Sequence, residues 1–442
     1  MKRIAILGAG LVGSLQAVLL AKRGYKVDLY EGRSDMRAQS MIGGKSINLS
    51  LSERGWTALR LAGIDKRVAD MAIPMKSRCI HMPDGKIMYQ PYGKEGQAIY
   101  SVSRGGLNKL LITAAEEKPE VTIHFSHKCT DIDLSTNSIA FDVNGQAVKS
   151  PAYDHIFGTD GAFSAVRTRL QKTERFNYSQ NYLEHGYKEL LIPAKDGAHQ
   201  IDSNSLHIWP RGEFMLIALP NLDGSFTCTL FFPYEGKHSF ASLTTPEKVV
   251  SFFNDTFSDA VALMPTLTQD FFENPTGSLV TIKCKPWNYQ DKIGLIGDAS
   301  HAIVPFYGQG MNSGFEDCTL FDGALENGED IGDLIRRFGK TRSVDADAMA
   351  ELAVKNFIEM RDKTGDTSFL LRKKIEKRLF ERNPDKWMPL YSQVTFSNIP
   401  YSEALAAGKR QELIMDKIMS KTDIETRWDS DEIEHEILSM VE

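Results

Sequence analysis

The sequence predicts a mixed α/β fold, and three observations lead to this prediction. A turn rich in glycine lies between two short apolar strands over residues 3–31. Short aromatic and β-branched runs separated by turn residues fill residues 183–233, a pattern typical of an antiparallel sheet. After residue 331 the apolar side chains follow a helical period. We therefore expect a Rossmann-type nucleotide-binding domain, an antiparallel-sheet domain and a C-terminal helical region.

The composition narrows the class of protein. A chain of 442 residues predicts two or three domains, and a net charge of −6 gives no indication of nucleic-acid binding. The N-terminus leads directly into a strand instead of a signal peptide, and no apolar run approaches the roughly 18 residues of a membrane span. Five scattered cysteines without a Cys-x-x-Cys pair predict reduced thiols in the cytoplasm, without disulfides or a zinc site. We expect a monomer or a homodimer with no transmembrane segment.

The first three elements of the chain, over residues 3–31, form a βαβ unit that carries a dinucleotide-binding pattern. Gly8, Gly10 and Gly13 open a helix after the strand at residues 3–7, and Glu31 ends the second strand. In this pattern the first glycine makes a tight turn, the second lets a pyrophosphate approach the backbone, and the third allows close packing. Glu31 is then placed to accept hydrogen bonds from the ribose of an adenosine.

Two arginines are candidates for contact with a phosphate of the bound dinucleotide. Arg33 follows Glu31 by two residues and could reach a phosphate or the adenine edge; a solvated loop arginine is the alternative. Arg104 begins a predicted helix after a strand-like run, which suits contact with a phosphate. For Arg104, too, the alternative interpretation is a simple surface arginine.

A third stretch, residues 294–317, reads as a buried strand, a turn and the start of a helix. Asp298 is presented where the strand ends, while Gly308 and Gly310 lie just before the helix. Backbone N–H groups at such a helix start can face an anion or an oxygen-rich ring. A flavin needs an acid for its ribityl hydroxyls and donors where charge collects on reduction, so we favour a flavin over an ordinary connection. His301 in the turn is interpreted as structural rather than as a base.

A hairpin is predicted at residues 76–92, because a Pro-Asp-Gly turn separates two strand-like runs. Arg78 and Tyr92 lie near its opposite ends. We therefore expect these two side chains to be neighbours in space.

Three motifs now stand in order along residues 3–317, and together they resemble the class A single-component flavoprotein monooxygenases. The motifs are Gly8-x-Gly10-x-x-Gly13 with Glu31, Gly158-Thr-Asp160-Gly161 through Arg167, and Gly297-Asp298 through Gly308-x-Gly310. The resemblance implies that Asp298 contacts the ribityl chain of FAD. It also implies that the segment Gly308–Asn312, with Gly310 and Met311, contacts the isoalloxazine, and that the Asp160 motif serves FAD and, transiently, NADPH.

Further stretches resemble the branch of this family that hydroxylates L-kynurenine. They are Ser77-Arg78-Cys-Ile-His with Tyr-Gln-Pro-Tyr92-Gly, Pro305-Phe-Tyr-Gly-Gln-Gly-Met-Asn312, Asn356-Phe-Ile-Glu359-Met-Arg-Asp, and Trp387-Met-Pro-Leu-Tyr391. By this resemblance Arg78 and Tyr92 bind the substrate carboxylate and Asn356 assists. Phe306 and Tyr307 would lie beside flavin and substrate. A C-terminal membrane anchor known from mitochondrial relatives is not expected.

The implied reaction converts L-kynurenine to 3-hydroxykynurenine with NADPH and O2, through a C4a-hydroperoxyflavin. It belongs to tryptophan catabolism and leads toward pyridine nucleotide biosynthesis. Because the cofactor supplies the reactive oxygen, no metal is needed. The resemblance and the patterns together predict an FAD-binding domain at 1–75, 101–180 and 286–330, a substrate domain at 76–100 and 181–285, and helices over 331–442.

Two other functions remain open on the sequence. One is a different hydroxylase or an epoxidase on the same fold. The other is a flavin-free binding or scaffold protein that docks a partner through the basic helix near residues 372–382, although such a run is also typical of a solvated helix face.

Overall fold

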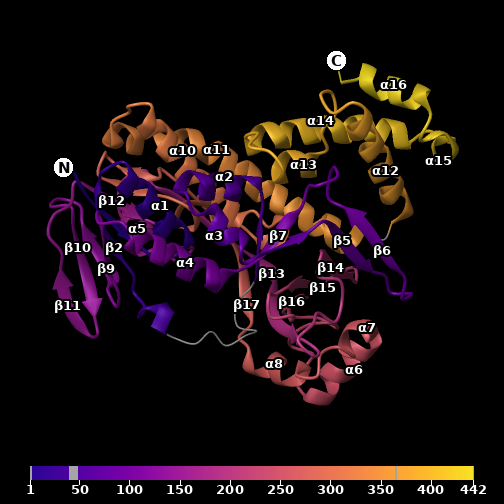
Figure 1. The fold of residues 1–442 in the computed structure, drawn as a ribbon, viewed down its shortest axis with the longest axis horizontal. Coiled ribbons are helices and arrows are strands. Elements are labelled where there is room, and N and C mark those ends of the chain that lie inside the picture. The colour runs from indigo at the N-terminus through magenta and orange to yellow at the C-terminus, as the bar shows by residue number, and fades with distance from the viewer. Residues whose placement is uncertain (1, 39–47, 364–365, 442) are drawn as a thin grey trace. The chain divides into compact units, whose positions relative to one another are not determined.

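The computed structural model describes residues 2–38, 48–363 and 366–441. The chain forms two compact units, each built from three separate segments (Figure 1). Unit 1 contains Met1–Ala72, Val102–Leu183 and Leu279–Ala350, and unit 2 contains Ile73–Ser101, Glu184–Ser278 and Glu351–Glu442. Each unit therefore depends on contacts between segments that are distant in sequence.

Unit 1 is organised around a six-stranded sheet. Its order is β18 (Asn288–Tyr289), β19 (Ile293–Leu295), β12 (His155–Gly158), β1 (Arg3–Leu7), β2 (Lys26–Tyr30) and β8 (Val121–His124). All neighbours are parallel except β18 and β19. Four of the five residues of β1 are buried, as expected for a parallel strand covered on both faces. The strands predicted at residues 3–7 and 26–30 are confirmed.

The sheet of unit 1 is accompanied by helices and a small antiparallel sheet. The helices are α1 (Leu11–Lys22), α2 (Glu53–Ala62), α3 (Asp65–Ala69), α4 (Arg104–Glu116), α5 (Ala165–Leu170), α9 (Asp298–His301), α10 (Gly310–Glu326) and the first part of α11 (Ile331–Ile358). The small sheet contains β9 (Lys128–Asp133), β10 (Ser138–Val143) and β11 (Gln146–Lys149). Helix α1 packs against both α4 and α10, which explains why almost its whole length is buried.

Unit 2 contains the predicted antiparallel sheet. The seven-stranded sheet that forms it runs in the order β17 (Gly277–Lys285), β13 (Asn177–Ile192), β16 (Phe226–Pro233), β15 (Met215–Pro220), β14 (Ser205–Pro210), β5 (Ser77–His81) and β6 (Ile87–Pro91). Helices α6 (Pro246–Thr256), α7 (Ser258–Val261) and α8 (Leu267–Glu273) share an aromatic core with β14, β15 and β16. Short elements complete the chain: β3 (Asn48–Leu51), β4 (Ala72–Met75), β7 (Ile99–Ser103) and the 3-10 turns Met36–Ala38 and Pro305–Tyr307.

The C-terminal part of unit 2 is helical, as predicted. It contains α12 (Thr367–Arg382), α13 (Leu390–Thr395), α14 (Tyr401–Met419), α15 (Ile424–Arg427) and α16 (Asp431–Ser439), which Figure 1 shows in orange to yellow. Helices α12, α14, α15 and α16 share an apolar core. Helix α11 ends at Ile358 and continues as a π-helical turn, Glu359–Lys363. Within the described ranges, every helix is too short or too polar to cross a membrane.

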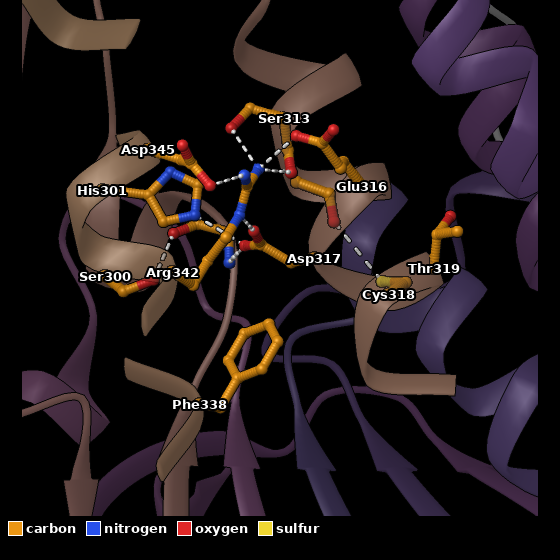
Figure 2. Close-up of polar contacts among 12 residues, drawn as sticks. Ser300, His301, Ser313, Glu316, Asp317, Cys318, Thr319, Phe338, Arg342 and Asp345 are labelled. Atoms are coloured by element: carbon orange, nitrogen blue, oxygen red, sulfur yellow. Dashed lines mark hydrogen bonds and ion pairs between the residues drawn. The ribbon is translucent and has the colours of Figure 1, made fainter. Parts of the chain in front are cut away.

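A buried ion cluster joins the last three helices of unit 1 (Figure 2). Asp317 of α10 is fully buried and binds Arg342 Nε of α11 at 2.7 Å and His301 Nε2 of α9 at 2.6 Å. Its second oxygen also accepts a hydrogen bond from the Gly297 N–H at 3.0 Å. Burial alone would raise the pKa of Asp317, but His301 and Arg342 hold it below its usual value. A second carboxylate, Glu316, pairs with Arg342 at 2.6 Å and with Arg54 of α2.

We predict that Arg342→Met destabilises the protein strongly, because it leaves the carboxylates of Asp317 and Glu316 buried without their shared cation. Breaking a buried pair in this way costs roughly 3–5 kcal/mol. The matched control is Arg336→Met on the same helix, since Arg336 is half-exposed and pairs with Asp333 at the surface. Urea unfolding followed by circular dichroism should show a much lower midpoint for Arg342→Met only; equal midpoints would contradict this role.

Candidate active site

Three parallel strands bring the sequence motifs to one edge of the unit 1 sheet. Strand β12 lies between β1 and β19, with Leu7, Gly158 and Leu295 in register. After β1 the chain enters the glycine turn, after β12 it reaches Asp160, and after β19 it reaches Asp298. Ligands of open parallel sheets bind at such carboxyl edges, so motifs 150 residues apart can form one site.

The glycine turn has the space that a dinucleotide needs. Gly8 has φ +105°, and a Cβ there would lie 2.7 Å from the Thr159 carbonyl oxygen. A Cβ on Gly13 would lie 2.0 Å from the Gly8 carbonyl oxygen. At Gly10, by contrast, an added Cβ meets no atom within 4 Å. Gly8 and Gly13 are therefore required by packing, whereas Gly10 leaves open space where a pyrophosphate would approach.

Glu31 is fixed next to this turn. Its buried carboxylate accepts hydrogen bonds from the Ala9 N–H at 3.1 Å and from the Arg33 N–H at 3.0 Å. The exposed Arg33 side chain donates to the same carboxylate through Nε at 2.8 Å. Arg104 is exposed at the first position of α4, where the Ser103 hydroxyl accepts from the Gly106 N–H. Both arginines thus lie in unit 1, with Arg33 already paired to an acid.

Asp160 retains an unused acceptor. Its Oδ2 caps α5 by accepting from the Ala165 N–H at 2.7 Å, while its buried Oδ1 has no hydrogen-bond partner in the described ranges. Burial raises the pKa of Asp160. In the same motif, Arg167 is buried and donates to the Ala299 carbonyl at 2.8 Å, which ties this turn to the Asp298 turn. An unsatisfied buried oxygen is costly, so Oδ1 fits a role in accepting a ligand hydroxyl.

Asp298 is exposed at the start of α9, directly after Gly297 with φ +65°. A Cβ on Gly297 would lie 3.1 Å from a Val12 methyl group, and a Cβ on Gly314 would lie 2.6 Å from the same group. The Val12 side chain therefore fills the space that these two glycines leave. The first and third motifs pack directly against each other, and this contact positions the Asp298 turn beside the glycine turn.

Helix α10 begins at Gly310 itself, one residue earlier than predicted, after Gly308 with φ +66°. Asn312 is fully buried, and its amide donates to the Ser50 and Gly308 carbonyls at 2.8 and 2.7 Å and accepts from the Ser52 N–H at 3.0 Å. Its side chain thus holds the turn in place. The N–H groups of Gly310, Met311 and Asn312 lie in the first helical turn, where backbone donors lack intrahelical partners. Phe306 and Tyr307 are buried in the 3-10 turn that precedes this helix.

A second group of candidate residues lies in unit 2, around Arg78. The hairpin forms as predicted: β5 and β6 pair antiparallel, with Arg78 opposite Gln90. The buried Arg78 guanidinium lies 5.6 Å from the ring centroid of Tyr92, so the expected neighbourhood is confirmed. It also lies 4.8 Å from the ring centroid of Tyr391. The two tyrosine rings stack with centroids 5.3 Å apart.

Tyr391 is the residue that the sequence did not assign to this group. Its position in α13, some 300 residues after Arg78, hides the contact, and only its place in a family-like stretch gave a signal. Burial raises the pKa values of Tyr92 and Tyr391, with the positive charge of Arg78 opposing the shift. Both hydroxyls therefore keep their protons at neutral pH and can act as donors beside the guanidinium.

The other predicted residues have distinct surroundings. Asn356 is buried in the last turn of α11, where its amide donates to the Met360 sulfur at 3.2 Å.

His301 is 5% exposed, stacks on Trp287 and is held by Asp317, which supports the structural interpretation. The basic side chains of α12 pair with acids of the same helix and of α14 and α16. This pairing leaves little free positive charge for docking a partner.

Comparison with known sequences finds a matching family and relatives that align over most of this chain. Residues 1–327 match the family described as FAD binding domain. A kynurenine 3-monooxygenase from Flavobacterium psychrophilum is 51% identical over 443 aligned residues, which cover 100% of this chain and 98% of that protein. The kynurenine 3-monooxygenase of Sus scrofa is 44% identical and covers 93% of this chain and 88% of its own length.

Two solved structures have a fold similar to that of this chain. A tetrameric form of 2-methyl-3-hydroxypyridine-5-carboxylic acid oxygenase superposes with a TM-score of 0.67 at 17% identity, over 85% of this chain and 97% of that chain. A tetracycline destructase superposes with a TM-score of 0.60 at 17% identity, over 90% and 99% of the two chains. These similarities confirm the predicted fold class.

The open space at Gly10 provides a test of the dinucleotide site. Gly10→Ala should leave the stability of the FAD-free protein unchanged, since the new methyl group meets no protein atom. It should weaken FAD binding at least tenfold, or about 1.4 kcal/mol, because the methyl group fills the space the pyrophosphate requires. Gly323→Ala is the control, as its added Cβ also meets no atom within 4 Å. FAD titration that gives equal dissociation constants for both variants would exclude this site.

Proposed function

This chain belongs to the kynurenine 3-monooxygenase family, and we propose that it hydroxylates L-kynurenine to 3-hydroxykynurenine with FAD, NADPH and O2. The observation that carries the proposal is 51% identity over the whole chain to a protein of that name. The group of Arg78, Tyr92 and Tyr391 supports it independently. These side chains suit an amino-acid substrate that carries both a carboxylate and an aromatic ring.

The residues of unit 1 are proposed to hold FAD. The glycine turn would accept the pyrophosphate and Glu31 the adenosine ribose, while Asp160 and Asp298 would accept hydroxyls of the cofactor. Gly308, Gly310, Met311 and Asn312 would offer backbone donors to the ring, with Phe306 and Tyr307 next to it. Arg33 and Arg104 are assigned to the phosphates. Bound FAD would supply the redox chemistry with NADPH and O2, so the protein must chiefly position the substrate and exclude water.

Arg78 is proposed to bind the substrate carboxylate. A carboxylate loses its water on entering a closed site, and a planar guanidinium compensates for this loss by donating two parallel hydrogen bonds. The protonated hydroxyls of Tyr92 and Tyr391 add donors, and their rings add apolar walls. Asn356 is proposed to assist from α11. Because Arg78 lies on a strand in the interior of a sheet, the carboxylate would be held by a rigid element.

The alternatives make distinguishable predictions. A different hydroxylase on this fold would consume NADPH with another aromatic acid or a lipid. A flavin-free scaffold would purify colourless, and the paired basic residues of α12 argue against it. For the cellular site we propose the cytoplasm, where the five free cysteines would stay reduced, and a monomer or homodimer as the active form.

The direct experiment measures NADPH oxidation by the FAD-loaded protein with and without L-kynurenine, together with identification of the product. We expect L-kynurenine to stimulate oxidation and 3-hydroxykynurenine to form in proportion to the NADPH consumed. If another aromatic acid stimulated NADPH oxidation and L-kynurenine gave no product, the protein would be a different hydroxylase.

We predict that Arg78→Ala weakens L-kynurenine binding by at least two orders of magnitude, about 2.7 kcal/mol, because the carboxylate loses its cation. The FAD content should stay normal, since the residues assigned to FAD lie in unit 1. Titration of L-kynurenine followed by flavin absorbance measures this effect. Arg410→Ala, an exposed arginine of α14, is the control and should bind as wild type. Equal dissociation constants for the two variants would exclude Arg78 as the carboxylate ligand.

Two substitutions of Tyr391 separate the contribution of its hydroxyl to L-kynurenine binding from that of its ring. Tyr391→Phe removes one donor and should weaken L-kynurenine binding only several-fold, because a net hydrogen bond is worth about 0.5–1.5 kcal/mol. Tyr391→Ala also removes the ring that stacks on Tyr92 and should weaken binding considerably further. The same titration applies; an unchanged dissociation constant for Tyr391→Ala would place this residue outside the substrate site.

A further inference from the structure

Three buried side chains with metal-binding atoms meet in unit 2, apart from the residues proposed to bind substrate. Cys79 Sγ, one ring nitrogen of His81 and one of His207 all lie within 4.8 Å of one another. Cys79 Sγ is 3.7 Å from His81 Nε2, which is 2.9 Å from His207 Nδ1. The sequence predicted no zinc site, because these residues form no Cys-x-x-Cys or closely spaced histidine motif.

The sheet explains why the three residues meet. Cys79 and His81 are two positions apart on β5 and therefore point to the same face. His207 of β14 is the direct register partner of Cys79 in the parallel pair formed by these strands. The three ligand atoms thus come from two hydrogen-bonded strands, which is a rigid arrangement.

Outer hydrogen bonds determine which ring nitrogens carry protons. His207 Nε2 is 2.7 Å from the Asp202 carbonyl oxygen, which can only accept, so this nitrogen is the donor. His81 Nδ1 is 2.6 Å from the Asp259 carboxylate, which also receives the Trp209 indole N–H at 2.9 Å. When both rings are neutral, each has one N–H, and the two inner nitrogens then both present lone pairs. Two lone pairs at 2.9 Å repel each other unless a cation lies between them.

We propose that Cys79, His81 and His207 form a binding site for a divalent metal ion of the zinc class. One thiolate and two imidazoles are a donor set that suits Zn²⁺, with the thiol proton released to solvent on binding. Metal-binding histidines typically donate their outer N–H to a carboxylate or a backbone carbonyl, as both rings do here. A shared proton could occupy the same point, but it would make no use of the third donor, Cys79.

Two of the three donor–donor distances are close to those that zinc requires, and the third, from Cys79 Sγ to the His207 ring nitrogen, is within 4.8 Å. Tetrahedral bonds of about 2.0 Å to nitrogen and 2.3 Å to sulfur place two nitrogens roughly 3.3 Å apart and a nitrogen and sulfur roughly 3.5 Å apart. The observed 2.9 and 3.7 Å differ from these values by a few tenths of an ångström. The Trp209 ring stacks on His81 with centroids 4.0 Å apart and limits its rotation.

The site would act as a clamp between β5 and β14. Arg78 lies between Cys79 and His81 in sequence, and alternation along the strand places it on the opposite face of β5. A bound ion would therefore fix the strand that carries Arg78 without touching the substrate. This inference does not depend on the proposed reaction, because the metal is not assigned a chemical step.

The test uses the full-length, FAD-loaded protein after removal of metals with a chelator. Titration with Zn²⁺, followed by dialysis and elemental analysis, should give about one zinc per chain. Titration with Co²⁺ should give a thiolate-to-cobalt charge-transfer band in the difference spectrum. Cys79→Ser should abolish this band, and Cys79→Ser and His207→Gln should each bind zinc at least tenfold more weakly. Asp259→Asn should weaken binding by roughly 10–100-fold, as loss of an outer partner typically does.

Two matched controls should retain zinc binding like that of the wild type. They are Cys129→Ser in unit 1 and His199→Gln in unit 2, whose ring nitrogen likewise donates to a backbone carbonyl. FAD content and circular dichroism verify that each variant is folded. Zinc should also raise the melting temperature of the wild type but not of Cys79→Ser. Absence of zinc uptake by the wild type, or equal uptake by all variants, would overturn the proposal; a strongly downfield imidazole proton resonance would then identify a shared proton as the occupant.

Discussion

The buried carboxylate of Asp317 is the interaction on which the arrangement of unit 1 depends. A fully buried charge is tolerated only when it is paired and hydrogen-bonded, and Asp317 has three partners: the Gly297 N–H, His301 and Arg342. Two of these lie within the turn that presents Asp298. The helix that carries Asp317 also begins at Gly310. The charge therefore forces the Asp298 turn and the start of α10 into one geometry, which is the preorganisation that cofactor binding requires.

The two units carry different parts of the chemistry by different means. Unit 1 offers turns at the carboxyl edge of a parallel sheet, where backbone donors and acidic side chains are available. Unit 2 offers side chains on strands and helices, where a cation lies beside aromatic rings. A guanidinium beside two stacked tyrosines gains cation–π attraction while it remains able to donate to a carboxylate. The same strand, β5, offers Cys79 and His81 on its other face, so one strand can serve both a substrate and a metal.

Local patterns were sufficient for much of this structure. The βαβ unit, the hairpin between residues 76 and 92, and a helix start next to Gly310 were all predicted, because periodicity, turn residues and glycine spacing act over a few positions. The π-helical turn after Ile358, by contrast, has no signal in the spacing of the sequence. Asn312 was assigned to the cofactor, yet its side chain is used to hold β3, a contact with a strand 260 residues earlier. Buried polar side chains of this kind find partners that local sequence does not reveal.

The sequence by itself determined the fold class, the three turns that face one sheet edge, and the family to which the chain belongs. Each of these depends on residues that are close together or on a motif read in order. The tertiary structure alone decided which distant side chains meet: Tyr391 with Arg78, Arg342 with Asp317, and His207 with Cys79. Such pairs form because strands align in register and because buried charges and rings must find partners. Register and partner choice are properties of the packed chain, so they appear only when the whole chain has folded.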